Sequence, residues 1–435
     1  MSRLLVVLPV LTLLACAAPT RSREWLARAV QERTSLTLGT GAPDAGLAPG
    51  VVFEDGLTAS EAASLALWNN PALHAELSQL EASLASLDEA KRPANPRINN
   101  LLAPLDARQL AIVLFVPIES LWQMPSRIAA ATAELEASAD SLLQLVLDTE
   151  RTARSAHADV LLAQERIAVL QRAADAWGQS VGLADARAAS GDIAPAEADA
   201  LRAEWLLAQD TVQRALHEVN IARARLMTLL GASTLPAIVT SPLPEERKED
   251  LCVLQTLALK QRPELSAAAL FVNAAASRAS WERSRVFSLF LSIDGQAPVG
   301  SFAPHFAPGL QAELPIFSQN QGGIGRADAA VVRATHRYAA TRLTVLQEVA
   351  VSQAALLRAK TSQGAAHRIT ELLEHAREAA ARAFQNGSES YVVVVDALRR
   401  TTDAQLRELE IEAELRRAEA EFVRALGGRT LVEKP

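Results

Sequence analysis

Residues 160–195 read VLLAQERIAVLQRAADAWGQSVGLADARAASGDIAP. Apolar residues recur three and four positions apart in this stretch, which is the spacing of one helix face. The same pattern begins after Pro125 and meets no proline before Ser190-Gly191-Asp192, so it predicts a helix of roughly 64 residues, about 95 Å long. Pro195 suits the first turn of a returning helix, and Gly231 suits its end. The stretch therefore predicts an antiparallel helical hairpin far longer than the helices of globular domains.

A second copy of this hairpin follows in the chain. Residues 324–385 predict another helix of about sixty residues, Asn386-Gly387-Ser388 predicts the turn, and Tyr391 to Leu426 predict the return. Four short segments recur in the same order, at offsets between 192 and 198 residues. The matched pairs are Asn70-Pro71 with Arg262-Pro263, Val116-Pro117 with Leu314-Pro315, Asp199-Ala200 with Asp396-Ala397, and Leu230-Gly231 with Leu426-Gly427. Constant order and near-constant spacing indicate a duplicated unit.

In each copy a helix and a β-hairpin precede the long helical hairpin. The first helix is predicted from Thr58 to Lys91 with a kink at Pro71, and its counterpart from Glu249 to Arg285. The predicted fold class is mainly α with a small membrane β part, arranged as two tandem repeats of helix, β-hairpin and long helical hairpin. The predicted divisions are a signal peptide (1–15), a lipidated N-terminal segment (16–55), a first repeat (56–231, strands about 97–117, tip about 190–195), a linker (232–248), a second repeat (249–428, strands about 287–317, tip about 386–391) and a tail (429–435).

Composition supports a helical, elongated chain without a nucleic-acid surface. Alanine, leucine, arginine and glutamate dominate the 435 residues, a mixture that favours helix. The formal net charge is -7, and acidic and basic residues are interspersed. This balance excludes a nucleic-acid-binding role and is typical of solvated helix faces.

The first residues have the features of a bacterial export signal. Arg3 precedes an apolar stretch from Leu4 to Leu14 that is too short to span a bilayer. Leu13-Leu14-Ala15-Cys16 looks like a lipobox, which would make Cys16 the acylated N-terminus of a lipoprotein. An ordinary signal peptide with an incidental cysteine is the alternative. The second cysteine, Cys252, lies in an apolar run and is expected to be a buried, inert thiol.

The predicted strands alternate in the way a membrane barrel requires. Apolar Phe287, Leu289, Leu291 and Ile293 alternate with polar residues, and Leu310 begins a second such run that ends near Phe317. One apolar and one polar face suit a wall between lipid and water. The segment from Ile112 to Val116 is apolar on both faces. Four strands cannot close a barrel, and open edges in lipid cost several kcal/mol per unpaired group. The chain is therefore expected to oligomerise, and three copies would supply twelve strands.

At this point the sequence resembles the TolC-like outer-membrane efflux proteins. The similarity rests on Leu57-Thr58-Ala59-Ser60-Glu61-Ala62 with Asn69-Asn70-Pro71, on Pro315-Ile316-Phe317 with Asn320-Gln321-Gly322, and on Gly387 followed by Asp396-Ala397. It covers residues 56–428, and the residues after Pro315 are most similar to the metal-efflux branch of the family.

This resemblance implies a homotrimer with a twelve-stranded barrel in the outer membrane and a twelve-helix tunnel in the periplasm. It also implies tunnel tips at Gly191-Asp192 and Gly387-Ser388 that dock on a periplasmic adaptor protein, with an inner-membrane pump of the RND type behind it. In the family a ring of aspartates narrows the tunnel past the second tip. Asp396 matches one of them, whereas Val393 stands where the other would be. A single ring of three Asp396 side chains could still select cations; a helix-capping or solvated Asp396 is the alternative.

Motifs for chemistry are weak in this chain. His367 and His375 lie eight positions apart, too far for a local metal site on a helix, and are expected on the surface. Gly322-Gly323-Ile324-Gly325 lacks the βαβ context of a dinucleotide loop. We therefore expect no catalytic residues, no cofactor and no metal site. The predicted function is a passive export duct, with heavy-metal cations as a candidate cargo. The alternative is a periplasmic coiled-coil structural or adaptor lipoprotein.

Overall fold

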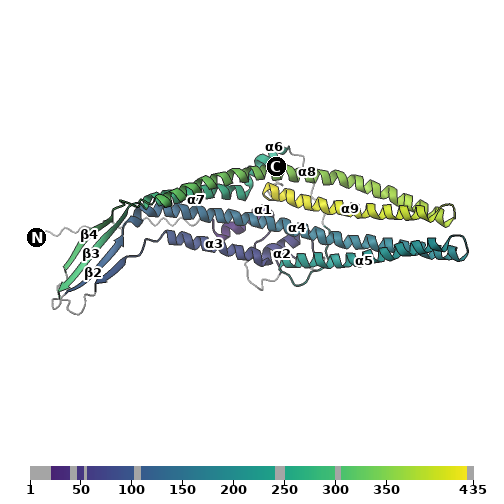
Figure 1. The fold of residues 1–435 in the computed structure, drawn as a ribbon, viewed down its shortest axis with the longest axis horizontal. Coiled ribbons are helices and arrows are strands. Elements are labelled where there is room, and N and C mark those ends of the chain that lie inside the picture. The colour runs from purple at the N-terminus through teal and green to yellow at the C-terminus, as the bar shows by residue number, and fades with distance from the viewer. Residues whose placement is uncertain are drawn as a thin grey trace.

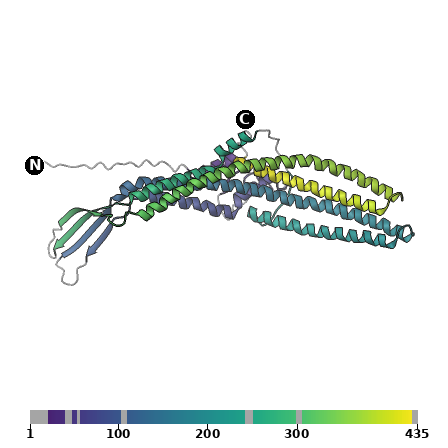
Figure 2. The ribbon, with the colours of Figure 1, turned by 45° about the horizontal axis from the view of Figure 1, so that its top comes forward.

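The computed structural model describes residues 21–39, 47–52, 56–101, 109–240, 250–298 and 305–428. The molecule is elongated, with a β-sheet at one end and the turns of two helical hairpins at the other (Figures 1 and 2). The elements are α1 (Arg23–Thr34), α2 (Ala59–Asn69), α3 (Pro71–Ala90), β1 (Arg97–Leu101), β2 (Gln109–Pro117), α4 (Glu119–Ala189), α5 (Pro195–Leu230), α6 (Leu251–Gln261), α7 (Pro263–Ser284), β3 (Ser288–Pro298), β4 (His305–Glu313), α8 (Gln321–Gln385) and α9 (Tyr391–Leu426).

The order of elements confirms the predicted duplication. After α1, two helices, a β-hairpin and a long helical hairpin follow one another, and the same series begins again at α6. The long helices α4 and α8 have 71 and 65 residues, and α5 and α9 have 36 each. The long hairpins are therefore antiparallel coiled-coil pairs in which the first helix extends well beyond its partner.

The helix predicted from Thr58 to Lys91 is two helices, so the prediction of a single kinked helix was wrong. The Asn70 side chain accepts hydrogen bonds from the backbone N–H groups of Ala72 and Leu73, which makes Asn70 an N-cap and Pro71 the first residue of α3. The helix predicted from 249 to 285 is divided in the same way at Arg262. A proline preceded by an extended residue starts a helix more readily than it kinks one.

Two other predicted boundaries move for related reasons. α4 begins at Glu119, before Pro125, because packing against α7 outweighs the one backbone hydrogen bond that the proline removes. Strand β4 spans His305–Glu313, earlier than the run predicted to end at Phe317. Pro315 has no N–H to donate to a ladder, so the strand ends before it.

The four strands form one antiparallel sheet in the order β1-β2-β3-β4. The register places Leu114 opposite both Ile98 and Ile293, and Ile293 opposite Pro308. Residues paired in this way lie on one face, which is predominantly apolar in β2, β3 and β4 and is joined by Ile98 of β1. Its members are Ile98, Ile112, Leu114, Val116, Leu289, Leu291, Ile293, Phe306, Pro308 and Leu310.

This apolar face confirms the alternation predicted from the sequence, and much of it is uncovered. Ile98 is 69% exposed, Phe306 69% and Leu310 71%. The opposite face mixes polar residues such as Ser292 and Asp294 with Phe115. Among the residues that the structure describes, no helix combines the length and apolar composition that a membrane crossing requires.

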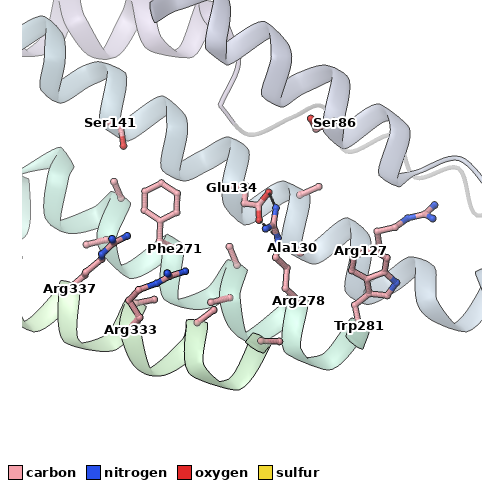
Figure 3. Close-up of a pocket in the computed structure, with 18 of the residues that line it drawn as sticks. Ser86, Arg127, Ala130, Glu134, Ser141, Phe271, Arg278, Trp281, Arg333 and Arg337 are labelled. Carbon is pink, nitrogen blue, oxygen red and sulfur yellow. Dashed lines mark hydrogen bonds and ion pairs between the residues drawn. The ribbon is translucent and has the colours of Figure 1, made fainter. Parts of the chain in front are cut away.

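The helices next to the sheet form a curved layer in which α3 packs on α4, α4 on α7, and α7 on α8. Towards the tips α5 takes the place of α3 beside α4, and α9 takes the place of α7 between α4 and α8. One face of the layer near the sheet is hollowed into a groove of about 1080 Å³, lined from all four helices (Figure 3). α1 packs on a different face of α4, against Leu135, Ala139 and Leu143.

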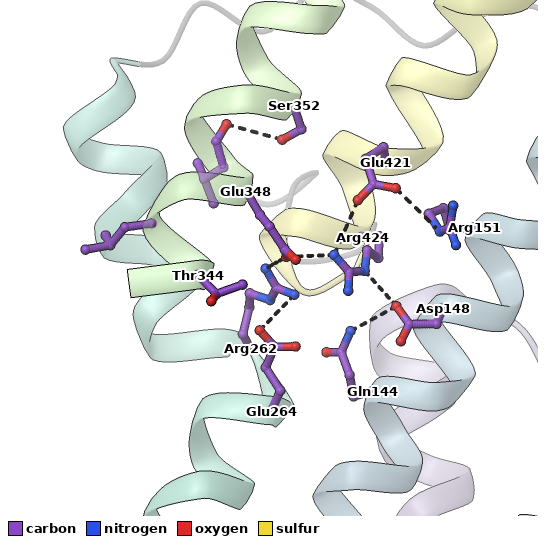
Figure 4. A network of polar contacts seen from close by, with 12 residues as sticks. Gln144, Asp148, Arg151, Arg262, Glu264, Thr344, Glu348, Ser352, Glu421 and Arg424 are labelled. Carbon is purple, nitrogen blue, oxygen red and sulfur yellow. Dashed lines mark hydrogen bonds and ion pairs between the residues drawn. The ribbon is translucent and has the colours of Figure 1, made fainter. Parts of the chain in front are cut away.

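A network of ion pairs joins the two repeats midway along the molecule (Figure 4). Arg424 near the end of α9 donates to Asp148 of α4 at 2.6 Å and to Glu348 of α8 at 2.7 Å. Glu348 also accepts from Arg262, whose side chain is fully buried and lies 3.0 Å from Glu264. One carboxylate is therefore shared by two arginines of the second repeat, one from the junction of α6 and α7 and one from α9.

The environment of this network shifts the pKa values of its members. Burial lowers the pKa of Arg424, but the hydrogen bond and charge of Asp148 and the charge of Glu348 outweigh it, so the pKa is raised. Burial raises the pKa of Glu264, and the charge of Arg262 partly opposes this effect. Arg424 thus stays charged at any physiological pH and holds α9 to both long helices.

We expect Glu348→Gln to destabilise the protein by about 1–3 kcal/mol, because two arginines, one of them buried, would lose a shared carboxylate that is itself partly exposed. Thermal unfolding in mild detergent, followed by circular dichroism, measures the change. Glu378→Gln is the matched control, since Glu378 forms only an exposed pair with Arg382 one turn away on α8 and should cost about 0–0.5 kcal/mol. Equal unfolding temperatures for the two variants would contradict a central role for Glu348.

Candidate functional site

The turns of the two long hairpins lie together at the end of the molecule opposite the sheet (Figure 1). At the first turn Gly191 has φ +79°, and the N–H of Asp192 donates to the carbonyl of Arg187 at 2.9 Å. At the second turn Gly387 has φ +75°, and the N–H of Ser388 donates to the carbonyl of Ala383 at 3.0 Å. Both are helix C-caps of the kind in which glycine adopts the left-handed conformation.

All four predicted tip residues are exposed. Nothing lies within 4 Å of a side-chain carbon built at Gly191 or Gly387, so the space in front of both turns is open. The predicted pair Gly191-Asp192 and the predicted pair Gly387-Ser388 are therefore the most distal residues of their hairpins. A surface of this kind is available to a partner protein without rearrangement of the chain.

Contacts between the hairpins fix the tips relative to each other. The guanidinium of Arg187 at the end of α4 lies 5.0 Å from the ring centroid of Phe384 at the end of α8. Further from the tips, Arg399 of α9 donates to Glu204 of α5. Leu398 of α9 is buried in a cluster with Trp177, Val181, Ala184, Ala198 and Leu201 of the first hairpin. The two tips thus behave as one packed end of the protomer.

The predicted gate position lies in the first turns of α9. Asp396 and Val393 are both exposed, whereas Val394 is buried. One oxygen of Asp396 lies 2.9 Å from Arg400, one helical turn further along. The exposed strip of α9 that contains Asp396 therefore carries a charge pair rather than an isolated carboxylate.

Sequence reasoning missed the contacts between the two hairpins near the predicted tips. The Asp396–Arg400 pair was readable from the sequence, because residues four apart on a helix are neighbours. The contacts of Arg187 with Phe384 and of Arg399 with Glu204 join positions 195 or more apart in the chain, and no local pattern indicates them.

The remaining candidate residues are placed as follows. Cys16 lies outside the residues that the structure describes. Cys252 is a free, exposed thiol, so the prediction of a buried one was wrong. It lies on the outer side of the short helix α6, which buries Leu254 and Ala258 instead. His367 is exposed as expected, and its Nδ1 lies 2.9 Å from Glu408. Within the described ranges, no three His, Cys, Asp or Glu side chains are placed to hold a metal ion.

Comparison with known proteins agrees with this architecture. Residues 254–428 match the family model described as outer membrane efflux protein. The cobalt-zinc-cadmium resistance protein CzcC of Cupriavidus metallidurans is 26% identical over 385 residues, which cover 85% of this chain and 90% of that relative. The similarity to the relative therefore extends over both repeats.

Several solved structures share the fold. The outer-membrane channel OprN superposes with a TM-score of 0.74 at 20% identity, covering 86% of this chain and 90% of that one. CusC gives 0.73 at 17% identity, with 85% and 92% covered, and the Campylobacter jejuni CmeC outer membrane channel gives 0.75 at 16% identity, with 86% of each chain covered. The predicted fold class is thereby confirmed. The second repeat thus matches the outer membrane efflux protein family, and the whole chain shares the fold of solved outer-membrane channels.

Proposed function

We propose that three copies of this chain form a passive duct that carries solutes out through the outer membrane, as the last part of a tripartite export system. The observation that supports it best is the four-stranded sheet with one predominantly apolar face. Three such sheets joined edge to edge would give twelve strands, and the apolar faces would meet lipid. The outer strands of neighbouring sheets would then pair with each other, so no unpaired backbone edge would face lipid.

The helical part suits the periplasmic section of such a duct. α4 has 71 residues, so at 1.5 Å per residue it is about 105 Å long. The hairpin tips at its far end present exposed turns, and a periplasmic adaptor protein is the partner we propose for them. An inner-membrane pump of the RND type is the partner that we propose to supply energy and to select the cargo.

Heavy-metal cations are the cargo class that we propose. The relative from Cupriavidus metallidurans bears the name of a cobalt, zinc and cadmium resistance protein and aligns over both repeats. A duct need not bind such ions tightly. A coiled-coil structural or adaptor lipoprotein is disfavoured, because neither needs a sheet with an uncovered apolar face.

The native mass of the full chain, extracted from outer membranes in mild detergent, tests this proposal directly. We expect a trimer that requires detergent to stay in solution. We also propose that Cys16 is acylated. The Cys16→Ser variant should lack the lipid but should still need detergent, because the apolar face of the sheet remains. A water-soluble monomer or dimer from the Cys16→Ser variant would contradict the duct and favour the structural lipoprotein.

We further propose that three Asp396 side chains form a ring that narrows the duct, with Val393 leaving the neighbouring ring position uncharged. Asp396→Ala should raise single-channel conductance in planar bilayers and weaken the preference for cations, because carboxylates at a constriction attract cations. The nearby Arg400 opposes that preference, so Arg400→Ala should strengthen it. Asp403→Ala, on the same helix two turns further from the tip, is the control. If Asp396→Ala leaves conductance and selectivity unchanged, the ring lies elsewhere.

Bulky substitutions at the tips should impair export while the amount of protein in the outer membrane stays the same. Gly387→Arg would place a long side chain on the proposed adaptor surface, and Gly191→Arg would do so on the other tip. Gly387→Asn and Gly191→Asn are matched controls, because asparagine tolerates the left-handed conformation and projects little. Metal accumulation in cells measures export, and quantitative blotting of outer membranes measures the amount. Equal export by the arginine and asparagine variants would show that these turns do not dock the adaptor.

A further inference from the structure

The two edge helices of the layer near the sheet carry opposite charge. α3 forms one edge, where it packs on α4. α8 forms the other edge, where it packs on α7. α3 contains four acidic residues and no lysine or arginine. Its acidic residues are Glu76, Glu81, Asp88 and Glu89, all exposed.

The facing half of α8 is basic. From Gln321 to Gln347 the helix contains one acidic residue, Asp328, and that residue is already paired with Arg283 of α7 at 2.5 Å. The same stretch contains Arg326, Arg333, Arg337 and Arg342, all exposed. Within the described part of the chain none of these four arginines has an ion-pair partner. Val332 and Leu343, which are also exposed, lie on the same segment of α8.

The charged residues of the two edges border the same face of the layer. Arg326, Arg333 and Arg337 line the groove of Figure 3 on the α8 side, and Glu89 lines it on the α3 side. Glu89 and these three arginines therefore border the hollow face, whereas Glu81 of α3 pairs with Arg23 of α1 at 3.6 Å on the other face.

These residues also lie at matching heights along the molecule. Arg127 of α4 donates to the carbonyl of Ala90, which fixes the end of α3 next to the start of α4. Gln123, one turn before Arg127, accepts from Trp281 of α7. Two residues later on α7, Arg283 is paired with Asp328 of α8. Following these contacts across the layer places Glu89 level with the segment between Arg326 and Arg333.

We propose that the edge of α8 binds the α3 edge of a second copy of this chain, with Glu89 of one copy between Arg326 and Arg333 of the next. This inference rests on the proposed trimer and names its contact surface. Rotation about the long axis of a ring keeps every residue at its height, so the α8 edge of one copy meets the α3 edge of the next at the same level. Such a head-to-tail interface closes into a ring, whereas pairing of two α8 edges would bring arginines against arginines. The exposed Val332 and Leu343 would be covered by the same contact.

Reversal of charge on one edge tests this surface. The full chain is extracted in mild detergent, and its native mass is measured over a dilution series. We expect the trimer of the Glu89→Arg variant to dissociate at a protein concentration at which the unaltered chain is fully trimeric. The Arg326→Glu/Arg333→Glu variant should behave in the same way. The variant Glu89→Arg/Arg326→Glu/Arg333→Glu should recover the trimer, since each interface again pairs opposite charges. The control, Arg172→Glu/Arg407→Glu, reverses two exposed charges on α4 and α9, which are not edge helices, and should remain trimeric.

The outcomes separate the interface from the function. If the unaltered chain is not a trimer, the proposed function fails first. If it is a trimer and the edge reversals dissociate no more readily than the control, this interface is wrong while the duct stands. Dissociation of both edge variants without recovery in the combined variant would also overturn the pairing, and far-UV circular dichroism of each variant shows whether the helices have formed.

Discussion

The sheet imposes the constraint from which the rest of the structure follows. One of its faces is predominantly apolar, and strands β1 and β4 have an outer edge that no other described strand covers. In water the apolar face is unfavourable, and in lipid the open edges are unfavourable. The closed assembly that we propose satisfies both requirements, because it turns the apolar face to lipid and pairs the strand edges. The layer of helices continues the sheet and has its edges on the same two sides, because α3 precedes β1 and α8 follows β4. In the proposed assembly these helical edges would also be covered by a neighbouring copy.

The long helices depend on lateral contacts rather than on their own propensity. α8 is exposed along much of its length, whereas α4 is largely buried or half-buried, and both hold their arrangement through apolar clusters and through charge pairs with α9. The shared carboxylate of Glu348 is the centre of the ion-pair network of Figure 4, where α4, α8, α9 and the junction of α6 and α7 meet. Between this network and the tips, the second hairpin is joined to the first by ion pairs such as those of Arg417 with Asp159 and of Arg399 with Glu204. Near the tips the buried cluster around Leu398 and the contact of Arg187 with Phe384 add to these pairs.

Charge in this protein is distributed by position along the duct. Near the sheet the hollow face carries Arg326, Arg333 and Arg337, which have no ion-pair partner among the described residues, whereas at the tips Asp396 shares its strip of α9 with Arg400. A duct that passes cations would therefore present positive charge at one level unless a neighbouring copy neutralises it. The acidic edge of α3 offers that neutralisation, which links assembly of the ring to the electrostatics of its interior. The same residues would then serve both the contact between copies and the passage of the cargo.

The sequence alone determined the duplication, the length of the hairpins, their tips and the alternation of the strands, because each of these follows from local periodicity and from the placement of proline and glycine. Gly191 and Gly387 could be identified as tips since only a left-handed residue closes such a turn cheaply. The periodicity could not show that Asn70 and Arg262 divide the short helices, because an N-cap and a kink leave the same residues in the same order. Cys252 was placed in the core wrongly, because α6 is short and its buried face could be either side of an apolar run. The tertiary structure alone decided which strands and helices form the two edges, which charges lie at the same height, and that Arg424, Glu348 and Arg262 meet. Those facts depend on the packing of residues far apart in the chain, and a one-dimensional pattern does not contain the distances between them.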